Sequence, residues 1–205
     1  LALSPLQGDL SCQEAGELLL QAFALGINFV DTAEFYENYP HIRWALDRWP
    51  GEIVVATKSY AYNKELAEKS LEKARREMNR DRIDIFMLHE QESYLTIKGH
   101  WEALEYLWNA KDKGIIGAVG ISTHTVAAVQ AAAEIKEIDV IHPMLNIRGL
   151  GIVDGTVDQM LAAIAQAKEA GKGIYTMKAI GGGNLLGNVQ EALNWVFRQK
   201  GVDAV

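Results

Sequence analysis

From Gly26 to Tyr36 the sequence reads GINFVDTAEFY. An apolar run is followed by the acid Asp31 and, five residues later, by Tyr36. The same arrangement recurs twice: Lys58 follows the apolar run 53–57, and His89 follows the run 83–88. Parallel strands that are covered on both faces are near-continuous apolar runs. We therefore interpret the three runs as strands whose carboxyl ends carry a carboxylate, an ammonium group and an imidazole.

Similar runs recur along the whole chain, with helix-like segments between them. The positions expected at the strand ends are Asp31, Lys58, His89, Ser122, Asn146 and Lys178. The intervening stretches have apolar residues at helical spacing, as in 64–78, 101–108 and 157–164, and Asp9 or Ser11 precedes an earlier one that ends before Gly26. A strand–helix unit of about thirty residues predicts a (β/α)8 barrel or a doubly wound sheet. The GxGxxG turn of dinucleotide-binding doubly wound sheets does not follow the first run, which favours the barrel.

The length of the chain fits only part of such a barrel. A complete one takes about 250 residues, and this chain has 205. We expect a single incomplete α/β barrel domain over residues 1–205, with the first strand reduced to residues 1–3 and the eighth cut off at 202–205.

Composition excludes several classes of protein. Apolar residues make up 49% of the chain and charged residues 23%, which is typical of a globular domain with a sizeable core. A net charge of −7 argues against nucleic acid or an anionic membrane as the main partner. There is no apolar run long enough to span a bilayer and no signal peptide, so we expect a cytoplasmic protein. The single cysteine and the scattered histidines predict no metal site.

Each strand-end residue also has a structural interpretation. Asp31 could form a turn, Lys58 could mark where a strand meets solvent, and His89 could be a core histidine. Their combination is harder to explain in this way, because an unpaired buried charge is costly. The carboxyl ends of barrel strands meet at one rim, where active sites are assembled, so we expect these side chains to share a site.

At this point the sequence resembles the aldo-keto reductases, which are NAD(P)H-dependent (β/α)8-barrel enzymes. The matching segments are 26–36, Ala56-Thr57-Lys58, 81–89 and Gly117-Ala118-Val119-Gly120-Ile121-Ser122. The resemblance implies a catalytic tetrad of Asp31, Tyr36, Lys58 and His89 that reduces an aldehyde or ketone. Tyr36 would donate the proton, Lys58 would lower its pKa, Asp31 would hold Lys58, and His89 would bind the carbonyl oxygen.

The resemblance also implies a set of residues that bind NADPH or NADH. Ser122 matches the serine that contacts the nicotinamide carboxamide, and Thr123 stands where asparagine is usual. His142 replaces a glutamine, and Met177 replaces a tyrosine that stacks on the nicotinamide. The pyrophosphate loop would be Gly181-Gly182-Gly183, ahead of a helix from about Asn188. The implied cofactor-binding set is Asp31, Ser122, Thr123, His142, Met177, Lys178, Ile180, Gly181, Gly182 and Gly183.

Two alternatives to a reductase of small carbonyl compounds remain open. The changes at His142 and Met177 keep a regulatory subunit possible, one that binds nucleotide on the same barrel with little turnover. A barrel lyase that uses Lys58 as a Schiff base is the other.

Overall fold

The computed structural model describes residues 1–2 and 10–205 of the chain, which form two compact units. The first unit consists of Leu1–Met87 with Glu102–Ala118, and the second of Leu88–Trp101 with Val119–Val205. Parallel strands follow one another in the order β1-β2-β3-β4-β5-β6. With helices between these strands, the chain is an α/β fold and an incomplete (β/α)8 barrel, as the sequence predicts.

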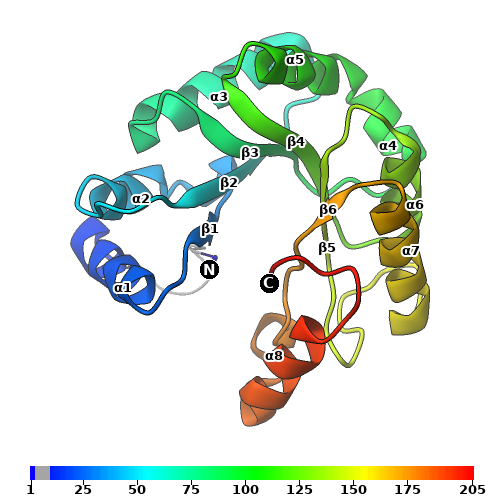
Figure 1. The fold of residues 1–205 in the computed structure, drawn as a ribbon. Coiled ribbons are helices and arrows are strands. Elements are labelled where there is room, and N and C mark those ends of the chain that lie inside the picture. The colour runs from blue at the N-terminus through cyan, green and yellow to red at the C-terminus, as the bar shows by residue number, and fades with distance from the viewer. Residues whose placement is uncertain (3–9) are drawn as a thin grey trace. The chain divides into compact units, whose positions relative to one another are not determined.

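The first element of the first unit is helix α1. The elements β3, α5 and β4 each have residues in both units. Their bounds are α1 Cys12–Ala24, β1 Phe29–Asp31, η2 Glu34–Tyr36, α2 Tyr39–Leu46, β2 Val54–Ser59, α3 Lys64–Met78, β3 Ile83–Leu88, α5 Trp101–Asp112 and β4 Ile116–Thr123. Strands β1 and β2 are parallel, with Phe29 opposite Val54 and Asp31 opposite Ala56. Figure 1 shows α1 and α2 together on one side of these two strands.

The second unit holds the later helices and strands. Their bounds are α4 Tyr94–Gly99, α6 Val126–Glu134, β5 Val140–Pro143, α7 Val157–Glu169, β6 Gly173–Ile174, η3 Gly181–Gly183, η4 Leu186–Asn188 and α8 Val189–Phe197. Strand β5 is parallel to β4 and to β6. Helices α6 and α7 lie side by side and cover one side of β5 and β6 (Figure 1).

The helices begin where the sequence supplies a cap. Ser11 caps α1 and exchanges hydrogen bonds with Glu14 in a capping box, and Thr156 does the same for α7 with Gln159. Asn63 caps α3, and Asn79 ends it in a left-handed conformation. The alternative cap of the first helix, Asp9, lies outside the described residues.

Two strands run further than their apolar runs indicate. β1 includes Asp31, and β2 continues through Lys58 to Ser59. The backbone N–H of Thr32 donates to the carbonyl of Ala56 at 2.9 Å, so the parallel pairing continues past the apolar residues. Strand pairing depends on backbone groups, which polar residues also carry, and a hydrophobic pattern does not detect it.

Both ends of the chain take part in parallel pairing. Ala2 forms a bridge with Asp31, and the N–H of Asp31 donates to the carbonyl of Leu1 at 2.8 Å. Ala204 forms a bridge with Tyr175. These contacts stand where we expected a reduced first strand and the start of an eighth, although Leu3 lies outside the described residues.

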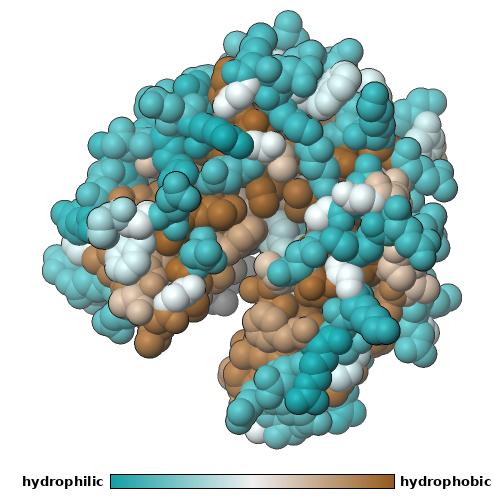
Figure 2. All heavy atoms as spheres, viewed as in Figure 1, coloured by the Kyte–Doolittle hydropathy of each residue, from teal (hydrophilic) through white to brown (hydrophobic). Residues whose placement is uncertain are grey.

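Apolar side chains fill the interior of each unit, and some remain at the surface. In β2 every residue after Val54 is buried, as expected for a strand covered on both faces. Exposed apolar side chains gather around α8, at the bottom of Figure 2, and include Leu186 and Phe197. Among the described residues, no helix has the length and apolar character that crossing a membrane requires.

Candidate active site

Asp31 and Lys58 form a buried ion pair in the first unit. The Lys58 Nζ atom lies 2.9 Å from Asp31 Oδ1 and 2.7 Å from Asp31 Oδ2, and it also donates to the carbonyl oxygen of Thr32 at 2.7 Å. Lys58 is 2% exposed and Asp31 8% exposed. An ammonium group has three hydrogens, so these three acceptors match its full donor capacity. The pair sits on neighbouring strands because Asp31 ends β1 and Lys58 lies near the end of β2.

Tyr36 lies beside this pair, on the short 3-10 helix η2 that follows β1. The Lys58 ammonium is 5.5 Å from the centre of the Tyr36 ring. Tyr36 is only partly buried.

The next tyrosine along the chain has a different environment. Tyr39 is 1% exposed, and its hydroxyl lies 2.8 Å from the Thr57 hydroxyl. Burial raises the pKa of Tyr39 above the usual range of a phenol, and only the hydrogen bond with Thr57 opposes this rise. Tyr39 is therefore a core residue, whereas Tyr36 is only partly buried.

Helix η2 is attached to helix α3 through Glu34. The Ser70 hydroxyl donates to Glu34 Oε2 at 2.6 Å, and Lys73 Nζ lies 3.8 Å from Glu34 Oε1. Glu37, just after η2, has a φ of 53°. A non-glycine residue in this conformation stores backbone strain, a feature common where a chain is held for function.

The second unit holds His89, which directly follows β3 and is 6% exposed. Beside it, the backbone N–H of Glu90 donates to Ser122 Oγ at 2.9 Å and that of Gln91 to the Ser122 carbonyl at 2.8 Å. Ser122 itself is fully buried at the end of β4. Glu90 has a φ of 50°, so this strand end is also strained.

Thr123 and His142 have well-defined partners of their own. The Thr123 hydroxyl lies 3.0 Å from the Thr125 hydroxyl and accepts a hydrogen bond from the Thr125 N–H at 2.9 Å. His142 stacks on Tyr175 with 3.9 Å between ring centres, and its Nδ1 lies 2.8 Å from the Tyr175 carbonyl. The carbonyl can only accept, so this contact places a proton on Nδ1 of His142. The structure thus assigns the Thr123 hydroxyl to a local turn and gives His142 a fixed ring orientation.

The predicted pyrophosphate loop, Gly181-Gly182-Gly183, comes shortly after Lys178, whose φ is 58°. Gly181, Gly182 and Gly183 have φ values of 61°, 63° and 96°, which glycine adopts without strain. The N–H groups of Gly181 and Gly183 donate to the carbonyls of Lys178 and Ile180, so they are engaged inside the loop. A Cβ atom at Gly182 or Gly183 would meet no heavy atom within 4 Å. The backbone is therefore open to close approach by a ligand at these two glycines.

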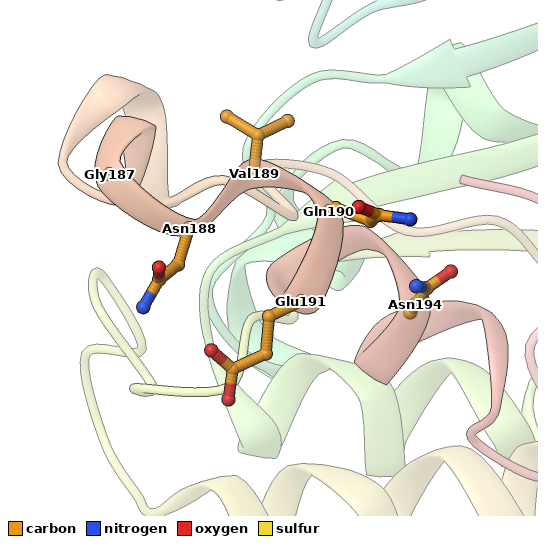
Figure 3. A pocket seen from close by; sticks show the side chains of 6 residues that line it. All are labelled: Gly187, Asn188, Val189, Gln190, Glu191 and Asn194. Carbon is orange, nitrogen blue, oxygen red and sulfur yellow. The ribbon is translucent and has the colours of Figure 1, made fainter.

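A shallow depression of about 500 Å³ surrounds the start of α8. It is lined by Gly187, Asn188, Val189, Gln190, Glu191 and Asn194 (Figure 3). Asn188 and Glu191 point to one side of the chain and Val189 to the other, so these side chains do not converge on one point. The Glu191 carboxylate in the first turn of α8 disfavours an anion there. None of the predicted site residues lines this depression.

The family model for the aldo/keto reductase family matches residues 3–202 of the chain. The chain belongs to the aldo/keto reductase family. This membership supports an oxidoreductase function and agrees with the barrel elements described above. A comparison with curated proteins gives no match.

Solved structures of aldo-keto reductases share the fold. A Pseudomonas aeruginosa protein described as an aldo-keto reductase is 26% identical with a TM-score of 0.79, over 95% of this chain and 74% of that one. An aldo-keto reductase from Bacillus halodurans in its holo form is 19% identical with a TM-score of 0.77, over 95% of this chain and 76% of that one. A Bombyx mori aldo-keto reductase in complex with NADP is 14% identical with a TM-score of 0.64, over 83% of this chain and 58% of that one.

The structure thus brings Asp31, Tyr36 and Lys58 together in the first unit, whereas His89 and the other predicted cofactor residues belong to the second. Two contacts of the predicted site residues were not expected from the sequence. The Thr32 carbonyl completes the coordination of Lys58, and His124 contacts Lys178. A backbone carbonyl carries no sequence signal. His124 did carry one, because it directly follows the strand end at Ser122 and Thr123. Within the described residues, no group of three or more potential metal ligands occurs.

Proposed function

We propose that this protein reduces the carbonyl group of an aldehyde or ketone with NADPH or NADH, and that Tyr36 is the proton donor. The observation that carries the proposal is the Lys58 ammonium, buried against Asp31 and 5.5 Å from the Tyr36 ring. Family membership and the aldo-keto reductase fold support the same chemistry. The small-molecule substrate, the nicotinamide cofactor and the individual residue roles are all parts of this proposal.

The residues at the predicted pyrophosphate loop, Gly181-Gly182-Gly183, fit a dinucleotide. Gly182 and Gly183 leave open space where a side chain would otherwise stand, and the Lys178 ammonium supplies a positive charge at the start of the loop. Ser122, His142, Met177 and Ile180 complete the proposed contacts to the cofactor. A bound NADPH or NADH would supply the hydride that the reduction needs.

In the proposed reaction, negative charge that grows on the carbonyl oxygen is neutralised by the proton from Tyr36. The phenolate that remains is stabilised by the Lys58 ammonium. Asp31 holds Lys58 in place, because both carboxylate oxygens accept from its Nζ. His89 would hydrogen-bond the carbonyl oxygen, a role that stays a prediction from the family resemblance. A positioned acid of this kind contributes about 10²–10⁴-fold to the rate.

The environment of Lys58 also argues against a Schiff-base lyase. A Schiff-base lysine must attack as a neutral amine and needs space at Nζ. Here Nζ is buried and donates to three oxygen acceptors, so no position on it is left for a substrate carbonyl.

The test is the Tyr36→Phe variant, assayed by NADPH oxidation with a panel of neutral aldehydes. We expect kcat to fall by about 10²–10⁴-fold while NADPH binding, followed by its fluorescence, is retained. Tyr39→Phe is the matched control, because it removes a hydroxyl from the same segment and should lower only stability, by about 1–3 kcal/mol. Unchanged turnover in Tyr36→Phe would refute the assignment. Saturable NADPH binding without turnover in the unmodified protein would favour the regulatory subunit.

A further inference from the structure

The side chains of His124 and Lys178 meet in the second unit, although 54 residues separate them in the sequence. Lys178 Nζ lies 3.3 Å from His124 Nε2. An ammonium group can only donate, so the His124 Nε2 atom must accept and must carry no proton. The contact therefore exists only while the imidazole is neutral.

Both residues stand on fixed backbone. His124 follows β4, and its carbonyl accepts from the N–H of Val153 at 3.1 Å. Lys178 follows Met177, whose N–H donates to the Pro143 carbonyl at 3.0 Å. The φ of 58° at Lys178 is one that a lysine rarely adopts, so the surrounding structure holds it there. The contact of the two side chains thus follows from how the strand ends are arranged.

The charges around His124 favour its neutral form. Burial lowers the pKa of His124, and the positive charge of Lys178 lowers it further, whereas Glu90 opposes the shift. Asp154, on the loop that contacts His124, is taken up by the N–H groups of Val126 and Ala127 at 2.6 and 3.0 Å. Of the described residues, none with a carboxylate forms an ion pair with Lys178. The Lys178 ammonium is therefore available to an anion that binds at the Gly181-Gly182-Gly183 loop.

We propose that His124 couples the binding of a phosphate group at Lys178 to the uptake of one proton. In the free protein, His124 is neutral and accepts from Lys178. An anion that reaches Lys178 attracts the ammonium and favours the charged imidazole, which then donates from Nε2 to the same anion. The contact between Lys178 Nζ and His124 Nε2 is replaced by two charge-assisted hydrogen bonds, one from each of these atoms to the anion. The proton that His124 gains comes from solvent. No covalent bond changes.

The chemistry of the site points to a phosphate group. Two cationic donors suit a compact oxyanion, and the open backbone at Gly182 and Gly183 lets a bulky group approach. In so far as the phosphate is the pyrophosphate of a nicotinamide dinucleotide, the inference rests on the proposed function. A phosphate carried by a substrate would be recognised by the same two donors.

The test measures proton uptake by calorimetry of the full chain. ADP-ribose and sulfate are titrated in two buffers of different ionisation enthalpy between about pH 5 and 8, where both ligands keep constant charge. ADP-ribose carries the pyrophosphate of a dinucleotide, and sulfate probes the bare anion site. We expect uptake that approaches one proton, and affinity that rises as the pH falls, by about tenfold for each unit by which the anion raises the pKa of His124.

Variants and a direct readout identify the residue. His124→Gln keeps a polar side chain that cannot titrate, and we expect it to bind both ligands without proton uptake. His100→Gln, a change of the other half-buried histidine in this unit, should leave the uptake unchanged. In the unmodified protein, NMR of the His124 ring should show its pKa rising when either ligand is added, which does not depend on any variant folding.

Each outcome decides the inference. Proton uptake that persists in His124→Gln, binding without uptake, or no saturable binding of either ligand would overturn it. ADP-ribose binding without uptake would leave the proposed function standing, whereas sulfate-linked uptake with no binding of ADP-ribose would count against the dinucleotide and favour a phosphate on the substrate.

Discussion

At the scale of single residues, the Asp31–Lys58 pair dominates the candidate active site. Both members are buried, and desolvating two charges costs free energy that only close contact and further hydrogen bonds offset. The structure supplies both, through two oxygens of Asp31 and the Thr32 carbonyl. Removal of one partner would leave the other charge buried and unpaired, so this pair affects stability as well as chemistry.

The Lys58→Met variant tests how much this ion pair contributes to stability. It leaves the Asp31 carboxylate buried without its cation, so we expect the free energy of unfolding to fall by about 3–5 kcal/mol. The double variant Asp31→Asn with Lys58→Met should recover part of that loss, because no buried charge remains. Urea denaturation of both variants checks this expectation. A double variant that is no more stable than Lys58→Met alone would contradict it.

At the scale of elements, the packing of strands β3 and β4 depends on a glycine. A Cβ atom at Gly117 would lie 2.5 Å from the carbonyl oxygen of Asp84 and 2.7 Å from the guanidinium of Arg82. A backbone oxygen in a paired strand cannot move away easily. The close approach of strands β3 and β4 therefore requires a glycine at position 117.

Gly117→Ala should accordingly destabilise the protein by about 1–3 kcal/mol, the usual cost of overpacking. Gly99→Ala is the matched control, since a Cβ there meets nothing within 4 Å and Gly99 lies in helix α4. Because alanine is the better helix former, the control should be neutral or stabilising by up to about 1 kcal/mol. Thermal denaturation compares the two, and equal losses of stability would show that the packing argument is wrong.

Asp203 connects the end of the chain to strand β6 and helix α7. Its Oδ2 accepts from the Ile174 N–H at 2.7 Å and from Lys168 Nζ at 2.8 Å. Partial burial raises the pKa of Asp203, but the bonds with Lys168 and Ile174 outweigh it, and the net pKa is lowered. A carboxylate with a lowered folded-state pKa contributes stability above its unfolded pKa, and this contribution is lost as the pH falls through the folded value.

We therefore expect Asp203→Asn to be less stable than the unmodified protein at pH 7. The difference should disappear on acidification below the ordinary pKa of an aspartate, about 4. Unfolding curves at several pH values measure it. A constant difference down to about pH 2 would mean that the charge of Asp203 contributes nothing.

At the scale of the whole molecule, net charge and exposed apolar surface act together. The chain carries −7 at pH 7, has a pI near 5.3, and exposes apolar side chains that include Phe197 at 63% and Leu186 at 67%. Repulsion between copies weakens as the net charge approaches zero, and exposed apolar surface then favours association.

Solubility should accordingly be lowest near pH 5.3. Phe197→Ser should raise it there and change the free energy of unfolding by no more than about 0.5 kcal/mol, because this side chain is largely exposed. Light scattering across pH tests the first expectation and urea denaturation the second. Aggregation that is equal in both proteins at pH 5.3 would exclude the apolar surface around Phe197 as its cause.

The sequence by itself determined the fold class and the three ionisable strand ends. Apolar runs, helix caps and the spacing of about thirty residues depend on neighbours along the chain, so periodicity predicts them. It also predicted that Asp31, Lys58 and His89 share a site, because carboxyl ends of parallel strands meet at one edge, and the resemblance to the aldo-keto reductases added Tyr36. The structure has Asp31, Lys58 and Tyr36 in the first unit and His89 in the second. Only the tertiary structure decided where each polar atom finds its partner. Lys58 meets the Thr32 carbonyl 26 residues away, Thr123 turns to Thr125, and His124 meets Lys178 across 54 residues. Such pairs depend on side-chain direction and strand register in space, which local spacing does not carry.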